Sequence, residues 1–165
     1  MEHGVWMFNR MLEGLDYVHK NGYVHGALTP EHVVVFASDA KDHPYNHGAK
    51  IVDWSYSVKI GDRVKAISPA WEEFYPPEIT SKQSVDPSTD IYMAAKCIIY
   101  VLGGDPCNDT LPPYIPSYLT RFLRGCVMKR KDLRPLDALV LHKEFTICLE
   151  ERYGPKKYVR FDMPT

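Results

Sequence analysis

One short polar stretch carries most of the side chains that could do chemistry. It runs from His25 to His32, and two apolar runs later it is followed by Asp53. A polar loop ahead of a strand pair, with an acid just past the second strand, is a common place for active-site groups on a rigid scaffold. Few side chains of this stretch are suited to catalysis, because Ala27 cannot transfer a proton and Thr29 carries no charge. The stretch is therefore either a working site or the shell of one.

The elements that must position this loop are helices and one strand pair. Apolar residues at spacings of three and four predict a helix over Val5–His19 that stops at Asn21-Gly22. The runs Val33–Phe36 and Ala49–Val52 predict a hairpin. The stretch from Asp53 to Pro77 has no clean period and predicts a long irregular segment. Three further helices are expected over Ile91–Leu102, Ser117–Met128 and from Pro135 to about Glu151.

Two of these helices carry more detailed expectations. The segment Ile91–Leu102 is apolar nearly all round, so it should be the most buried helix, and Ser88 could cap its start. Pro135 suits the first position of the last helix. The buried face of that helix is expected to comprise Leu136, Leu139, Val140 and Phe145.

Length and composition bound the class of protein. The chain has 165 residues with a formal net charge of -1, which favours one globular domain and gives no basic field for nucleic acid or an anionic membrane. Its four cysteines form no Cys-x-x-Cys pair, which predicts reduced thiols in a cytoplasmic protein. No signal peptide or membrane span is evident. We expect a domain over residues 1–152 and a C-terminal tail over 153–165.

Five short motifs follow one another along the chain. They are His25 to Val33, Asp53-Trp54-Ser55, Tyr75-Pro76-Pro77-Glu78, Thr89-Asp90-Ile91-Tyr92 and Leu133-Arg134-Pro135. In this order and at these spacings they closely resemble the large C-terminal lobe of a eukaryotic-type protein kinase, over about residues 5 to 150. The fold class that this implies is mainly α (α+β): a helical bundle with a small β-hairpin and a long loop like a kinase activation segment.

The resemblance also implies chemical roles, which this sequence replaces selectively. In a working kinase the catalytic-loop Asp accepts the substrate proton, and the loop Asn and the D-F-G Asp hold Mg²⁺. Ala27 occupies the base position, Thr29 a nearby cation position and His32 the Asn position, while Asp53 keeps its metal-binding identity. Gly26 replaces the Arg that would pair with a phosphate on the activation segment. The degenerate kinase positions, at which we expect no catalytic residue, are His25, Ala27, Thr29, His32 and Asp53.

The positions that hold the kinase fold together are better preserved. The resemblance implies that Glu78 and Arg134 form a largely buried ion pair. It implies that Asp90 accepts backbone hydrogen bonds from the loop around His25. It also implies that Trp54 stacks with His25. Fold-keeping residues thus remain where chemistry-carrying residues are replaced, a pattern typical of a pseudokinase lobe.

The same positions bear on metals and nucleotides. Asp53 is either a residual metal ligand or a loop carboxylate that caps backbone N–H groups, and the second is favoured because one carboxylate alone holds Mg²⁺ poorly. An imidazole such as that of His32 is a poor ligand for Mg²⁺. His32, His43 and His47 show no spacing diagnostic of a metal site with Asp53. We therefore expect no metal site, and weak or absent binding of ATP and magnesium.

The predicted function follows from the contrast between retained fold-keeping residues and replaced catalytic residues. We expect a catalytically inactive lobe, and hence no enzyme, that acts as a protein-binding or regulatory module. The partner would be another protein or domain, or a second copy in a homodimer, on the exposed inter-lobe face or the activation-segment-like loop, with Trp71, Phe74 and Tyr75 as anchors. One alternative is a piece of a larger atypical protein kinase, with ATP-dependent phosphotransfer that uses Asp53 and a nucleotide-binding lobe elsewhere. Another is a purely structural scaffold.

Overall fold

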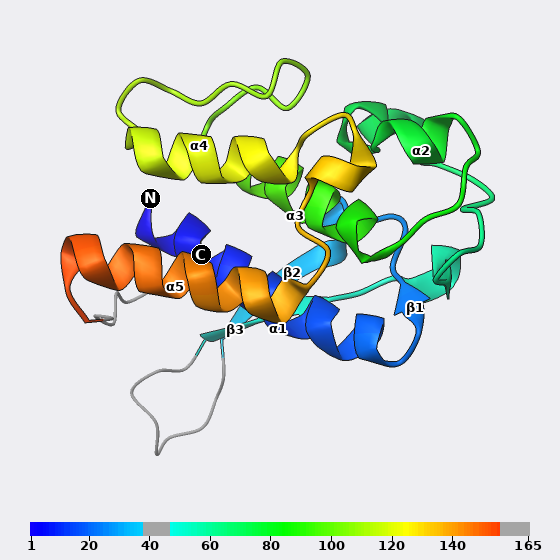
Figure 1. The fold of residues 1–165 in the computed structure, drawn as a ribbon, viewed down its shortest axis with the longest axis horizontal. Helices are drawn as coiled ribbons and strands as arrows, with labels where there is room; N and C mark the ends of the chain where they lie inside the picture. Colours follow the sequence, from blue (N-terminus) through cyan, green and yellow to red (C-terminus); the bar gives the residue numbers. More distant parts are fainter. Residues whose placement is uncertain (38–46, 156–165) are drawn as a thin grey trace.

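α-Helices dominate the structure, and two short antiparallel strand pairs accompany them in the described part of the chain (Figure 1). The computed structural model describes residues 1–37 and 47–155. The helices are α1 (Glu2–Lys20), α2 (Pro77–Thr80), α3 (Pro87–Val101), α4 (Ser117–Cys126) and α5 (Ala138–Tyr153). The strands are β1 (Tyr23–Val24), β2 (Val33–Ala37), β3 (His47–Ile51) and β4 (Val58–Lys59). The predicted class, mainly α with a small β-hairpin, is confirmed.

The central helix is α3, as the sequence predicts. Every residue from Ser88 to Ile99 is buried. Its start differs from the prediction, because Asp86 rather than Ser88 is the cap: the Asp86 carboxylate accepts the Ser88 N–H at 3.0 Å, and the Thr89 hydroxyl accepts the Asp86 N–H at 3.3 Å. This reciprocal capping box fixes the position at which the buried helix begins.

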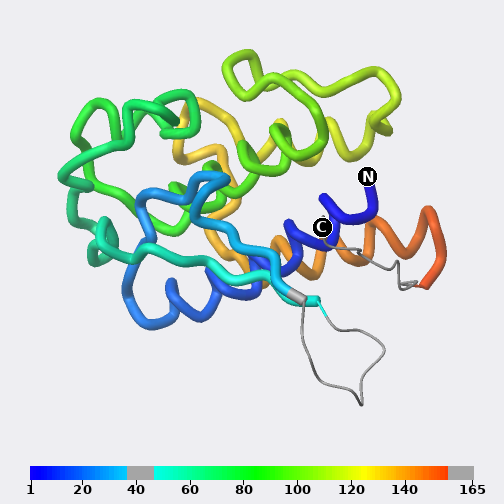
Figure 2. The backbone as a smooth tube through the Cα atoms, turned by 180° about the vertical axis from the view of Figure 1, so that it is seen from behind, coloured from blue at the N-terminus to red at the C-terminus, as the bar shows by residue number. Residues whose placement is uncertain are grey.

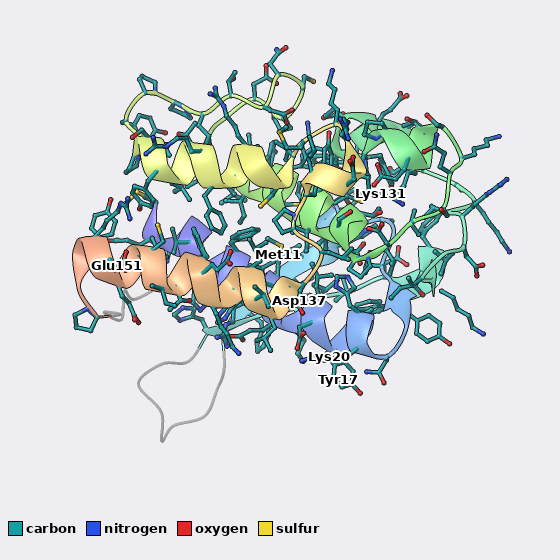
Figure 3. All side chains as sticks on the ribbon, viewed as in Figure 1. Met11, Tyr17, Lys20, Lys131, Asp137 and Glu151 are labelled. Atoms are coloured by element: carbon teal, nitrogen blue, oxygen red, sulfur yellow. The ribbon has the colours of Figure 1, made fainter. Side chains whose placement is uncertain are left out.

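The core forms where α1, α3, α4 and α5 meet. α1 packs on α3 and on α5, and α4 packs on α3. The Phe8 ring meets the rings of Phe145 and Phe122 edge-on, with centroids 5.3 and 6.4 Å apart, which joins α1 to α5 and α4. In Figure 3, Met11 lies among the packed helices, whereas Tyr17 projects from the outer surface of α1. α1 is thus amphipathic, as its spacing predicts.

The strands form two separate antiparallel pairs in the described residues. β2 and β3 form the predicted hairpin, with Val33 opposite Ile51, and they run side by side in Figure 2. The second pair was not predicted: β1 lies against β4, with Tyr23 opposite Lys59. A two-residue strand has too little sequence for a period, so its partner could not be read from the sequence. This pair ties the entrance of the polar loop to the segment beyond Asp53.

The segment between Asp53 and Pro77 contains only short elements, as expected. It holds β4 and the 3₁₀ turns η2 (Trp54–Tyr56) and η3 (Pro69–Phe74), and α2 follows directly. Two other 3₁₀ turns are η1 (Pro30–His32), inside the polar loop, and η4 (Lys131–Leu133).

The start and buried face of α5 differ from the prediction. The helix begins at Ala138, and the Asp137 carboxylate caps it by accepting the Val140 N–H at 2.8 Å. Pro135 therefore lies before the helix, because Asp137 supplies the stronger start signal. Leu136 and Val140 are exposed. The buried face consists of Ala138, Leu141 and Phe145.

The last helix reaches nearly to the end of the described chain. α5 ends at Tyr153, and Gly154 follows with φ 76°. The rest of the expected tail, residues 156–165, lies outside the described residues. Among the helices of the described chain, none is both long enough and apolar enough to cross a membrane.

Candidate functional site

Asp90 holds the polar loop onto the central helix. Its carboxylate, fully buried in the first turn of α3, accepts the backbone N–H of His25 at 2.8 Å and that of Gly26 at 2.9 Å. The ring Nε2 of His19, from α1, lies 3.0 Å from the same carboxylate. One buried acid thus ties α1, α3 and the loop together, in the role that the resemblance implies for it.

His25 connects the loop to the strand that leads to Asp53. Its Nε2 lies 3.1 Å from the Val52 carbonyl and its Nδ1 accepts the Ala27 N–H at 3.3 Å, so Nε2 carries the proton. Burial lowers the pKa of His25 below its ordinary value of 6.5, against the opposing effects of Asp90 and the Val52 carbonyl. The Trp54 ring meets the His25 ring edge-on at 4.6 Å. The expected contact between these two rings is therefore present as an edge contact rather than a parallel stack.

The positions of the kinase base and cation face inward. Ala27 and Thr29 are both fully buried. The Ala27 carbonyl lies 2.6 Å from His32 Nδ1, and the Thr29 hydroxyl lies 3.3 Å from the same nitrogen. The side chain of Ala27 offers no group to accept a proton. These residues contribute to the packing and the internal hydrogen bonds of the loop.

Asp53 caps the turn that follows β3. It has φ 57° and its Oδ1 accepts the Ser55 N–H at 3.3 Å and the Ser55 hydroxyl. The Ser55 hydroxyl, and then the Ser55 N–H, lower the pKa of Asp53 below its ordinary 3.8. This is the capping arrangement that the sequence analysis favours. The other carboxylate oxygen, Oδ2, lies 3.4 Å from His32 Nε2.

The histidines that the sequence analysis considered as metal ligands are not gathered around Asp53. His32 lies beside it, whereas His47 packs its ring on Trp6 at 4.6 Å, and His43 lies outside the described residues. Among residues 1–37 and 47–155, no three His, Cys, Asp or Glu side chains form a group that could hold a metal.

The ion pair between Glu78 and Arg134 links the end of the irregular segment to the chain before α5. Arg134 donates two hydrogen bonds to the Glu78 carboxylate, at 2.6 and 2.9 Å, and both side chains are buried. Arg134 also donates to the carbonyl groups of Met128 and Lys129, and the Thr89 hydroxyl donates to Glu78 at 3.0 Å. The expected pair is thus present and fully hydrogen-bonded.

Gly26 sits where a kinase would carry an arginine, and the structure leaves no room for one. Its φ is 74°, and a Cβ here would lie 2.7 Å from a methyl group of Val64 and 3.3 Å from the Tyr56 carbonyl. Val64 belongs to the irregular segment and is buried. The segment therefore packs directly onto the loop backbone at this point.

The three aromatic residues expected to anchor a partner are mostly buried. Phe74 is fully buried and Tyr75 nearly so, which corrects their prediction as surface anchors. The physical reason is that this end of the segment folds back on α3: Trp71 meets Phe74 and Tyr100 edge-on at 5.2 and 5.9 Å. Trp71 is partly buried and packs against the core. Exposed apolar side chains near the polar loop are instead Val34, Trp54 and Ile60.

One group of charged residues, centred on Lys96 of α3, was not predicted from the sequence. Lys96, in the middle of α3, is buried and forms an ion pair at 2.5 Å with Asp109, which is partly exposed. The centroid of the Tyr92 ring lies 5.2 Å from Lys96 Nζ and 4.7 Å from the Arg134 guanidinium. The signal was a single lysine inside a helix that is otherwise nearly all apolar. Such a residue requires a partner when it is buried.

The known proteins to which the chain is similar agree with the resemblance that the motifs indicate. No protein family model matches the chain. It is 27% identical over 147 residues to sperm motility kinase Z of Mus musculus, and 26% identical over 126 residues to the eIF-2-alpha kinase GCN2 of Rattus norvegicus. It is 31% identical over 103 residues to the calcium/calmodulin-dependent protein kinase type II of Caenorhabditis briggsae. These matches cover 82%, 72% and 59% of the chain.

The comparisons correct one prediction. The chain was expected to be no enzyme, but the relatives named here are protein kinases, so its kinship points to an enzyme family. The chain spans only 26%, 7% and 17% of the lengths of these relatives. The likeness thus reaches part of each kinase. Together, the mainly helical fold and the kinase relatives make this a protein-kinase-like domain.

Proposed function

We propose that this kinase-like lobe acts as a protein-binding, regulatory module, and that its partner docks beside the loop from His25 to His32. The observation that carries the proposal is a rigidly held loop flanked by exposed apolar side chains. Asp90 and His25 fix the loop through buried hydrogen bonds. A surface that is ordered before binding loses little entropy on association, which favours recognition.

Three exposed side chains near this loop are the proposed contact residues. Val34 lies on β2, directly after the loop, and is 44% exposed. Trp54 touches His25 and is 39% exposed. Ile60 is 41% exposed and follows β4, which pairs with the strand entering the loop. Aromatic side chains such as Trp54 are enriched among the few residues that carry most of the binding energy at protein interfaces, and neighbouring side chains serve to exclude water around them.

A second candidate function is phosphotransfer within a larger protein. The kinase names of the relatives favour it, because they align with most of this chain. In that case a nucleotide-binding lobe outside the described residues would supply the grip on ATP, and Asp53 would be the acid that this chain contributes. Asp53 is exposed, as such a role requires.

Partner retention by surface variants tests the first candidate. The tagged chain is expressed in its native source, and the amounts of co-purifying proteins are quantified for the wild type and for a Val34→Ser/Trp54→Ser variant. We expect the variant to lose at least one abundant partner while its melting temperature stays close to that of the wild type. Tyr114→Ser is the matched control, because Tyr114 is 74% exposed but lies in the loop before α4. Equal losses for both variants, or none for either, would refute the proposed surface.

The same preparations also test the second candidate function and determine whether the chain is a monomer or a dimer. Radiolabelled phosphate transfer from ATP that is lost on Asp53→Ala would establish phosphotransfer and make partner binding secondary. Light scattering on the purified chain reports a homodimer directly. A dimer that dissociates in the Val34→Ser/Trp54→Ser variant would identify the partner as a second copy.

A further inference from the structure

We propose that α4 and the link after it carry a second docking surface, which binds a short acidic segment of another protein. Its residues, named the basic face here, are Arg121, Arg124, Met128 and Lys129, and all four are exposed. α4 and β1 lie well apart in Figure 1. Binding to the basic face therefore does not depend on docking beside the loop from His25 to His32.

The basic face lies in the part of the chain with the strongest local excess of positive charge. Residues 117–131 contain five basic side chains and no acidic one, although the whole chain has a formal net charge of -1. Two of the five are neutralised, because Arg130 pairs with Asp132 at 2.5 Å and Lys131 pairs with Asp86 at 3.0 Å. The other three belong to the basic face and have no ion-pair partner among residues 1–37 and 47–155.

The core-facing side of α4 fixes the direction in which the basic face points. The helix buries Leu119, Leu123 and Cys126. Arg121 and Arg124 are exposed and lie three positions apart, which makes them neighbours on the helix surface. Met128 stands four positions after Arg124, just past the helix end, and is 41% exposed. Two guanidinium groups and a thioether thus follow one another along the outer side of α4.

Stabilisation of α4 itself does not account for the basic face. Cations near the C-terminus of a helix interact favourably with its dipole, but only within the last turn. Arg124 lies in that turn, whereas Arg121 lies in the middle of Ser117–Cys126 and Lys129 lies beyond its end. All three are exposed, so core packing does not require them either. These charges are therefore available to an external group.

The chemistry of the side chains indicates a partner that carries carboxylates. An arginine presents a planar fork that can bind a carboxylate through two hydrogen bonds. Two arginines about 4.5 Å apart along a helix axis match acidic side chains three or four positions apart on a partner helix. Met128 adds an adaptable apolar contact. Nucleic acid or an anionic membrane is disfavoured, because both require a wider positive field than a chain of net charge -1 provides.

Binding of a labelled peptide to the full chain tests the basic face. The probe is a fluorescein-labelled helical peptide of glutamate and alanine with one central leucine, and fluorescence anisotropy measures its dissociation constant. We expect binding that weakens about tenfold when NaCl rises from about 50 mM to about 300 mM, because salt screens exposed charges. Arg121→Glu/Arg124→Glu should abolish this binding. The same variant should instead bind a peptide in which lysine replaces each glutamate.

Arg63→Glu/Lys65→Glu is the matched control, because it reverses two exposed charges outside α4. It should keep the wild-type affinity within about twofold, since charges far from the contact are screened. The proposal fails if the wild type does not bind the glutamate peptide, or if both variants lose it equally. A folded Arg121→Glu/Arg124→Glu chain that keeps the glutamate peptide, or that does not bind the lysine peptide, also overturns it.

Two further measurements complete the test. If charge reversal prevents folding, Arg121→Gln/Arg124→Gln replaces it, and unchanged affinity for the glutamate peptide would then contradict the basic face. Vesicles that contain phosphatidylserine are titrated with the wild type in the same buffer. We expect weaker binding to the vesicles than to the peptide. The opposite order would assign the basic face to a membrane surface and overturn the proposal.

Discussion

Replacing Arg134 by methionine should be among the most damaging single changes to this fold. The variant removes two hydrogen bonds to Glu78 and two to the carbonyl groups of Met128 and Lys129. It leaves the Glu78 carboxylate buried, with Thr89 as its remaining hydrogen-bond donor. Breaking one side of a buried pair costs on the order of 3–5 kcal/mol. For a chain of this size, that corresponds to a fall in melting temperature of about 10 °C.

Urea denaturation at neutral pH, followed by circular dichroism, measures this loss. The matched control is Arg130→Met, because Arg130 pairs with Asp132 at the surface, where both side chains are exposed. Exposed pairs contribute about 0–1 kcal/mol. We therefore expect a difference of several kcal/mol between two variants that make the same chemical change.

A double-mutant cycle identifies the source of the loss. Glu78→Leu/Arg134→Met removes both charges, so it should be less destabilised than the sum of the single variants. If Arg134→Met cost less than about 1 kcal/mol, or if the single effects simply added, the buried pair would not hold the segment to the later helices.

Three further changes test individual contacts of the loop. Because burial keeps the pKa of His25 below 6.5, the unfolded chain takes up this proton first, so the free energy of unfolding should fall as the pH drops below about 6.5. Urea titrations at several pH values should show a shallower dependence for His25→Gln, and an unchanged dependence would contradict the assignment. Ser55→Ala should raise the pKa of Asp53 toward 3.8, as followed by carboxyl NMR, since the Ser55 hydroxyl is the main group that lowers it. Gly26→Arg should cost about 1–3 kcal/mol of stability from its left-handed backbone alone. Val64→Ala in the same chain should recover part of the loss, because it removes the methyl group that a Cβ at position 26 would meet at 2.7 Å, and no recovery in urea denaturation would contradict this contact.

The parts of the fold that were predictable are those with long periodic patterns. The spacing of Phe8, Met11 and Leu15 predicts α1, and the nearly continuous apolar run predicts the buried α3. Helix starts with several candidate signals were predicted less well: Asp86 rather than Ser88 caps α3, and α5 begins after Asp137 rather than at Pro135. Several candidate caps stand close together in the sequence, and only the packed chain decides between them.

The site was predictable where a motif fixed a contact, and not where packing did. Glu78, Arg134 and Asp90 make the contacts that the kinase motifs imply. The burial of Phe74 and Tyr75 depends on how the irregular segment folds back on α3, and no period in the sequence encodes this. The contact between Gly26 and Val64 was not predicted for the same reason: the two residues are far apart in sequence, and only the tertiary fold brings them together.

Hydrogen exchange on the chain alone and in its purified complex tests the proposed function most directly. Backbone amides of β2 and of the turn after Asp53 should exchange more slowly in the complex, because the partner covers Val34 and Trp54. Amides of α5 should be unaffected, since that helix carries none of the proposed contacts. Protection confined to α4 or α5, with β2 unchanged, would contradict docking beside the loop from His25 to His32.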